Sequence, residues 1–153
     1  MALRDRFGPR IEAMHARLLG FAAEFGITDF RPRDRSPNTR RALCVAEYAR
    51  DEGRLDAFRR LAMDAHWRRG MDLESDDDLR TLAGEAGLDP DRAVATTHDN
   101  QYLARIRARR EEAESRGITG IPTFVIGRQA VVGCQPYETL ARFVEAAGAK
   151  RRT

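Results

Sequence analysis

The side chains best suited to covalent chemistry in this sequence are its two cysteines. Cys44 and Cys134 lie ninety residues apart, so the chain holds no Cys-x-x-Cys pair. Thiol–disulfide exchange by a single site needs two thiols close together. Cys134 precedes a helix expected to begin near Pro136, where the helix dipole favours a thiolate. Cys134 is therefore the better candidate nucleophile of the two. The favoured interpretation makes it a small residue in a buried turn, and Cys44 is interpreted as a packing residue.

A proline-bearing apolar segment precedes Cys134. It reads Gly117-Ile118-Thr119-Gly120-Ile121-Pro122-Thr123-Phe124-Val125-Ile126, followed by Gly127-Arg128-Gln129 and Ala130-Val131-Val132. Short β-branched runs on either side of a tight turn predict a β-hairpin that leads into the C-terminal helix. Proline cannot donate to a strand ladder, so Pro122 belongs at the mouth of the first strand. At the least, Pro122 shapes the entry to that strand.

No metal site is predicted from the sequence. His15, His66 and His98 lie in separate segments without the spacing of metal ligands. The acidic run from Met71 to Leu79 lacks the spacing and the glycine of a calcium loop, and its carboxylates suit a helix start.

Composition predicts one domain in the cytoplasm. The chain has 153 residues and is 42% apolar, which is enough for a single core. It has no apolar run of about eighteen residues and no apolar signal region, so neither membrane association nor secretion is expected. The cysteines are expected to be free thiols. The net charge is +3, but 26 of the 27 basic residues are arginines spread along the chain, so a nucleic-acid partner is not favoured.

Apolar periodicity and capping residues predict a mainly α-helical chain around the hairpin. A short extended piece is expected at 27–30, within a loop at 27–36. The expected helices run from Pro9 to Gly26, from Asn38 or Thr39 to Arg50, from about Leu55 to Gly70, from Ser75 or Asp76 to Gly87, briefly from Pro90, from Asp99 to about Arg116, and from about Pro136.

The first strand of the hairpin raises a packing problem. Phe124, Val125 and Ile126 are apolar on both faces, which is typical of a strand covered on both sides. An isolated hairpin is marginally stable, and an apolar edge promotes association. The edge is therefore expected to pair with a second subunit, with the 27–30 segment, or with chain beyond these residues. A homodimer through this edge is the favoured prediction.

Several stretches of the sequence resemble a known family. "GITGIPTFVIGRQAVVGCQPYETLARF" resembles the end of DsbA-like thioredoxin-fold proteins. "SPNTRRAL", "HWRRGMDLESDDDLRTLAGEAGLD" and "RREEAESRGITGIPTF" resemble the helical insertion of the FrnE-like and 2-hydroxychromene-2-carboxylate isomerase branch. The resemblance extends from about Leu3 onward. It implies a partial thioredoxin-like α/β fold with a large helical insertion, as one domain over 1–153. The helical part would cover about 1–116, and the hairpin with its helix about 117–148.

The resemblance also implies a binding site. In the family the proline equivalent to Pro122 is cis, and the backbone of the preceding residue, here Ile121, receives an extended peptide or glutathione. Ile121, Pro122, Thr123 and the Asn38 of "PNT" are the substrate-binding residues implied, although Asn38 also suits a helix cap. The family's Cys-x-x-Cys, or the serine of the isomerases, lies before everything visible here. The family's Ala-His is also changed, since Leu43 follows Ala42.

Three functions follow from these observations. The favoured prediction is a catalytically incomplete relative of the protein disulfide oxidoreductases that binds a peptide or a small thiol. Its oxidoreductase character rests on resemblance alone. The alternative is an isomerase or transferase in which glutathione or a lone cysteine supplies the sulfur. A basic nucleic-acid-binding protein is the least favoured. No cofactor other than glutathione is expected.

Overall fold

The computed structural model describes residues 3, 5 and 8–150, and the chain divides into two compact units. Residues 1–107 form the first, called here the helical unit, and residues 108–153 form the second, called the hairpin unit. Helix α7 (Asn100–Ser115) begins in the helical unit and ends in the hairpin unit. Each unit is described by itself.

The first long helix of the helical unit, α2 (Arg10–Glu24), has a largely uncovered apolar stripe. The helix follows Pro9 and ends before Gly26, whose φ of +74° suits the left-handed region that glycine tolerates. Its start and stop match the prediction. Ile11 and Ala22 are its buried residues, whereas Met14, Leu18 and Phe21 are about 40% exposed.

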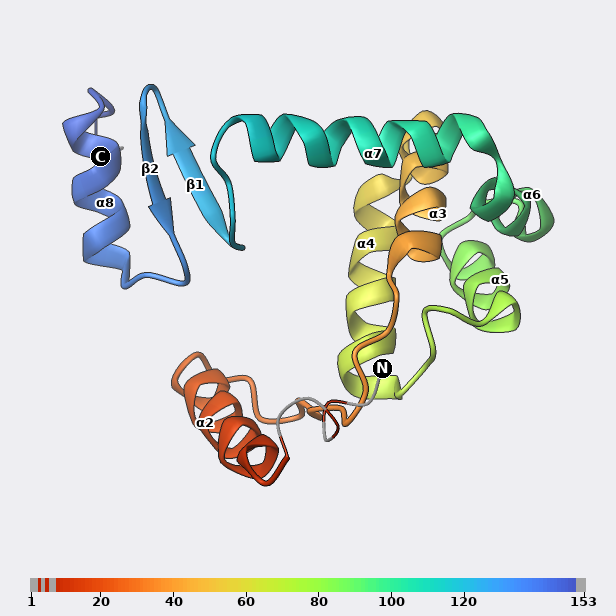
Figure 1. Ribbon diagram of the computed structural model, residues 1–153, viewed down its shortest axis with the longest axis horizontal. Coiled ribbons are helices and arrows are strands. Elements are labelled where there is room, and N and C mark those ends of the chain that lie inside the picture. Colours follow the sequence, from red (N-terminus) through yellow and green to blue (C-terminus); the bar gives the residue numbers. More distant parts are fainter. Residues whose placement is uncertain (1–2, 4, 6–7, 151–153) are drawn as a thin grey trace. The chain divides into compact units, whose positions relative to one another are not determined.

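Four helices enclose the core of the helical unit (Figure 1). They are α3 (Arg40–Asp51), α4 (Leu55–Asp64), α5 (Asp76–Glu85) and α6 (Pro90–Ala95). Each turns one apolar stripe inward, and the largest fully buried side chains of this core are Phe58, Leu79, Leu82 and Val45. The predicted caps of two helices are confirmed, because Ser75 accepts from the Asp78 N–H and Pro90 occupies the first position of α6.

The helix predicted to end by Gly70 changes type before it stops. After Asp64 the chain makes a π-helical turn, η1 (Ala65–Arg69), and Gly70 closes it with a φ of +71°. A 3₁₀ turn, η2 (Thr96–His98), joins α6 to α7. The π turn adds a residue to the helical register and so changes which side chains face inward.

The prediction of an extended piece at 27–30 is wrong. No strand is present among these residues, and the segment is held by contacts with η1 instead. The ring of Phe30 stacks on that of Trp67 at 4.5 Å, the Arg31 N–H donates to the Trp67 carbonyl at 2.9 Å, and Arg68 pairs with Asp29 at 2.6 Å. Ring stacking, one backbone hydrogen bond and an ion pair therefore hold the segment without any strand ladder.

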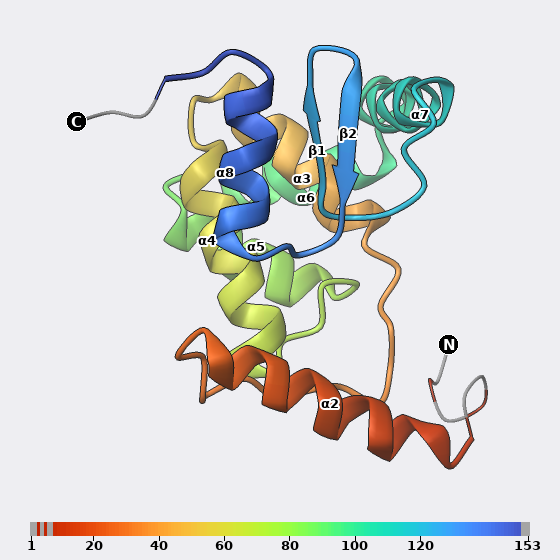
Figure 2. The same cartoon turned by 90° about the vertical axis from the view of Figure 1, so that its left-hand side faces the viewer.

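The predicted hairpin is confirmed. Strands β1 (Thr123–Ile126) and β2 (Gln129–Val132) pair antiparallel, with Thr123 opposite Val132 and Ile126 opposite Gln129. Gly127, with a φ of +61°, lies in the turn between them. Helix α8 (Tyr137–Ala146) follows and lies beside the hairpin (Figure 2). Together with the helices this makes a mainly α-helical fold with one small antiparallel sheet.

Candidate functional site at the proline hairpin

The loop before β1 exposes Ile121 to solvent. The Ile121–Pro122 peptide bond is cis, and Ile121 is 93% exposed. The Thr123 hydroxyl donates to the Gly120 carbonyl at 2.6 Å, which folds the loop back on the strand. A Cβ added to Gly120 would lie 3.3 Å from a methyl group of Val132, so glycine lets this part of the loop approach β2. The sequence therefore builds a compact loop with Ile121 at its outer surface.

The free edge of β1 can be derived from the register. The Gly133 N–H donates to the Pro122 carbonyl at 2.8 Å, so Pro122 and Gly133 form a hydrogen-bonded pair. Hydrogen-bonded and non-bonded pairs alternate along an antiparallel ladder. Thr123 and Val125 therefore belong to non-bonded pairs, and their N–H and C=O groups face away from β2. Within the described residues this edge meets no other strand.

The outer edge of β2 is different. The Gln135 side chain donates from Nε2 to the Val132 carbonyl at 2.8 Å, so it occupies an acceptor that an added strand would need. A side chain at a strand edge is one way in which proteins limit edge-to-edge pairing. The hairpin is therefore more open to strand addition at β1 than at β2. This role of Gln135 could not be predicted from the sequence, because nothing in its local pattern indicates which carbonyl it reaches.

Cys134 lies at the same end of the hairpin as Pro122. It directly follows Gly133, which pairs with Pro122, and its thiol is free and exposed. The interpretation of Cys134 as a residue in a buried turn is therefore wrong. The chain leaves the sheet at Gly133, with a φ of +90°, and α8 starts only at Tyr137, so the turn stays at the surface.

Cys44 has the opposite environment. It lies on α3 with no exposed surface, and burial raises the pKa of its thiol. Its interpretation as a packing residue agrees with this environment.

Asn38, the fourth predicted binding residue, lies in the helical unit, whereas Ile121, Pro122, Thr123 and Cys134 lie in the hairpin unit. Its side-chain oxygen accepts from the Arg40 N–H at 3.1 Å, next to the start of α3. Its own N–H donates to the Glu74 carboxylate at 2.6 Å. These contacts favour the helix-start interpretation of Asn38, one residue before the N-cap Thr39.

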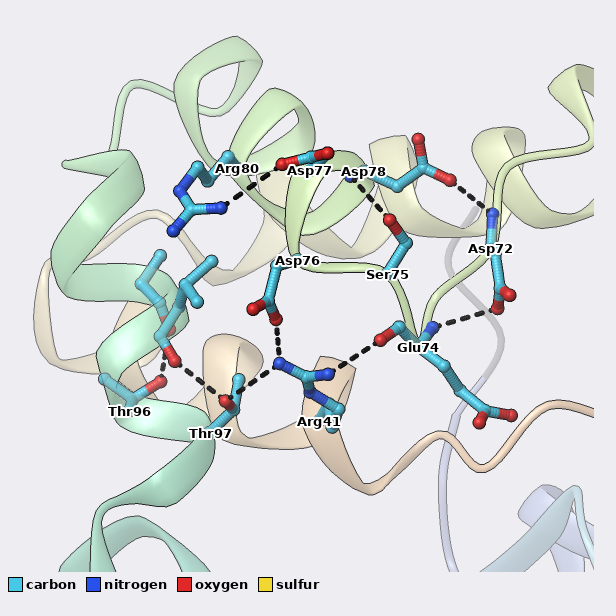
Figure 3. Close-up of polar contacts among 12 residues, drawn as sticks. Arg41, Asp72, Glu74, Ser75, Asp76, Asp77, Asp78, Arg80, Thr96 and Thr97 are labelled. Atoms are coloured by element: carbon cyan, nitrogen blue, oxygen red, sulfur yellow. Dashed lines mark hydrogen bonds and ion pairs between the residues drawn. The ribbon is translucent and has the colours of Figure 1, made fainter.

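A polar network centred on Arg41 fixes the beginning of α3 (Figure 3). The Arg41 guanidinium pairs with Asp76, donates to the Glu74 carbonyl at 2.8 Å, and reaches the Thr97 hydroxyl at 3.4 Å. The network thereby ties α3 to the start of α5 and to η2. This half-buried arginine has a structural role that the sequence did not single out.

His66 in η1 is the polar residue of greatest interest outside the hairpin. Its Nδ1 atom is buried without a hydrogen-bond partner, and burial together with the nearby Arg33 guanidinium lowers its pKa. This environment could not be predicted from the sequence, because a π turn has no local signature. Within the described residues, no three His, Cys, Asp or Glu side chains are grouped to hold a metal ion.

Comparison with known proteins identifies relatives over nearly the whole chain. Residues 2–145 match the model of the DSBA-like thioredoxin domain. The structure superposes on the crystal structure of a probable DsbA oxidoreductase from Streptomyces coelicolor with a TM-score of 0.83 and 28% sequence identity, over 99% of this chain and 67% of that one. A 2-hydroxychromene-2-carboxylate isomerase from Sphingobium xenophagum is 28% identical over 125 residues. That match covers 82% of this chain and 63% of the isomerase.

Proposed function

Because the chain belongs to the DSBA-like thioredoxin domain family, we propose that its hairpin unit binds an extended peptide, or a small thiol such as glutathione, at Ile121 and the free edge of β1. The observation that carries the proposal is that an exposed Ile121 and a free β1 edge lie on either side of Pro122. Extended peptides add to such edges through backbone hydrogen bonds, and neighbouring side chains supply selectivity.

The side chains around this edge suit an apolar ligand. Phe124 is 39% exposed and Val125 is 48% exposed, and they lie on opposite faces of β1 because side chains alternate along a strand. A peptide added at this edge would bury both. The Thr123 and Val125 backbone groups would supply donors and acceptors that β2 does not use.

We further propose that these 153 residues bind without exchanging disulfides. They contain two cysteines, one buried in α3 and one exposed after β2, and no Cys-x-x-Cys pair. Exchange at a single site needs a second thiol near the first to resolve the mixed disulfide. The Streptomyces relative is named a probable DsbA oxidoreductase, and this chain spans 67% of that protein.

Two measurements on the 153-residue chain test this proposal. Binding of a short fluorescein-labelled peptide of alternating valine and threonine, followed by anisotropy, should weaken at least ~10-fold in Ile121→Glu, which corresponds to about 1.4 kcal/mol. Met63→Glu is the matched control, because Met63 is an exposed apolar residue on α4 in the other unit. Equal binding by Ile121→Glu and Met63→Glu would show that Ile121 is not part of the site. Insulin reduction should stay at background, and turnover comparable with that of an intact DsbA relative would contradict the absence of exchange.

A second function is favoured by the position of Cys134. Its exposed thiol lies at the Pro122 end of the hairpin, and a relative of this chain is named an isomerase. In this alternative, reduced glutathione or Cys134 adds reversibly to the substrate and leaves again after isomerisation, with no net redox change. Calorimetry with reduced glutathione distinguishes the alternatives. Binding that persists in Cys134→Ser would assign the sulfur to glutathione, and no binding together with no isomerisation would exclude this function.

Assembly and location are proposed from the same features. We propose that a second copy of the chain covers the β1 edge when no peptide is bound, so that peptide binding and dimerisation compete. Two free thiols suit a reducing compartment such as the cytoplasm. Within the described part of the chain, no helix has the length and hydropathy needed to cross a membrane.

A further inference from the structure

A small polar cavity lies inside the helical unit, between η1 and the loop that leads to α3. Arg33, Arg35, Pro37, His66, Met71 and Asp72 line it. His66 lines the cavity, and its Nδ1 atom is buried and has no hydrogen-bond partner among the described residues. Buried polar atoms are nearly always paired with protein or with ordered water, so the unpaired nitrogen needs an explanation.

The imidazole is fixed in place by its surroundings. The N–H groups of Gly70 and Met71 both donate to the Ala65 carbonyl and close the π turn on which His66 lies. The His66 ring packs edge-on against Trp67 at 4.5 Å, and Trp67 in turn stacks on Phe30. Turning the ring would break its contact with Trp67.

The charged groups around the cavity already have partners. Arg33 donates to the Met71 carbonyl at 2.8 Å, and Arg35 pairs with Asp72 at 3.2 Å and with Glu74 at 2.9 Å. Asp72 also accepts from the Glu74 N–H at 3.0 Å. These bonds hold the side chains at the cavity wall, and none of them reaches His66 Nδ1.

The size and lining of the cavity indicate its occupant. Its volume is about 10 Å³, which is the space required by one water molecule in a polar cavity. Two guanidinium groups in the wall disfavour a cation. We propose that the cavity binds one ordered water molecule, which is the hydrogen-bond partner of His66 Nδ1 and bridges η1 to the loop before α3.

The direct test is water–protein NOE spectroscopy on the whole 153-residue chain. We expect a cross-peak between a long-lived water molecule and the His66 ring protons, and the same peak in His98→Phe, a control at an exposed histidine of η2. His66→Phe removes the unpaired nitrogen and should lose the bound water. A native chain without this cross-peak would overturn the proposal, whether or not His66→Phe folds. A cross-peak that disappears when chloride is added would also overturn it, because an anion would then be the preferred occupant.

Discussion

The two thiols of this chain differ because of what surrounds them. Cys44 is a fully buried residue of α3. Removing its thiol from water disfavours the thiolate and raises the pKa of the thiol. Cys134 lies at the surface beyond the end of β2. Since the thiolate is the reacting species, the two cysteines should differ strongly in their rates of modification.

This contrast predicts the outcome of thiol counting. In the folded chain, Ellman's reagent should modify one of the two thiols rapidly, and the second should react only after unfolding in guanidinium chloride. Cys134→Ser should abolish the rapid phase, whereas Cys44→Ala should leave it unchanged. Rapid modification of both thiols in the folded protein would show that Cys44 is accessible and would contradict its assignment to the core.

His66 makes a second residue-level prediction, on stability and pH. Burial is the main cause of its lowered pKa, the Arg33 guanidinium adds to it, and Asp72 opposes it. The unfolded chain therefore binds more protons than the folded chain just below the ordinary value of 6.5. The contribution of neutral His66 to the free energy of unfolding should then be fully present above about pH 6.5. It should be lost as the pH falls below that value.

Urea titrations between neutral and mildly acidic pH test this linkage. His66→Asn cannot take up the proton, so its stability should fall less steeply below pH 6.5 than that of the native chain. His98→Asn, at an exposed histidine, should keep the native slope. If the slopes of the native chain and His66→Asn were equal, His66 would not be the group responsible.

At the level of elements, the two edges of the hairpin are unequal. Gln135 occupies the Val132 carbonyl on β2, whereas the Thr123 and Val125 backbone groups on β1 stay open by the alternation of the ladder. An open apolar edge is a site of association, and a lysine placed on it is an effective block. Assembly through the hairpin should therefore depend on β1 and not on β2.

Matched substitutions separate the two edges. Val125→Lys, on β1, should weaken dimerisation at least ~10-fold, which corresponds to about 1.4 kcal/mol. Val132→Lys, on β2, should leave dimerisation nearly unchanged. It is a matched comparison because the native Val132 is 52% exposed and the native Val125 is 48% exposed. Sedimentation equilibrium over a range of concentrations measures both. A native chain that stays monomeric at high concentration would refute the dimer, and an equal effect of both lysines would refute the choice of edge.

The elements that local chemistry specifies were predictable from the sequence. Pro90, Ser75 and Gly87 mark helix boundaries through effects that act within one turn, and β-branched runs around Gly127 mark the hairpin. The π turn at His66 and the fixed loop at Phe30 were not predictable, because both depend on contacts with distant residues such as Trp67. The exposure of Cys134 was not predictable either, because the sequence does not show how far the turn after Gly133 lies from the start of α8. For the candidate site, the Ile121–Thr123 loop was predictable from the sequence. The ladder register that leaves the β1 edge free and the Gln135 hydrogen bond that occupies the β2 edge were not.

On the scale of the whole molecule, many of the arginines are paired locally with carboxylates. The chain has 27 basic and 24 acidic residues. Arg69 forms two hydrogen bonds with Glu85, at 2.7 and 2.8 Å, and this pairing lowers the pKa of Glu85. Arg105 pairs with Asp51 at 2.6 Å, and Arg110 pairs with Glu114 at 2.7 Å. Individually these exposed pairs stabilise the fold only slightly, but they place a negative charge beside many of the arginines.

Nucleic-acid binding should therefore be absent. Affinity for a duplex comes mainly from basic groups that neutralise phosphates and release counterions, so it is strongest at low salt. An arginine already paired with a carboxylate must give up that partner to contact a phosphate, which reduces the gain. We expect no change in the anisotropy of a labelled DNA duplex at ~50 mM salt and micromolar protein, where non-specific binders already associate. Glu85→Gln frees Arg69 and provides the comparison, because any weak binding should increase in this variant. Tight binding by the native chain that weakens steeply with added salt would instead restore the nucleic-acid hypothesis.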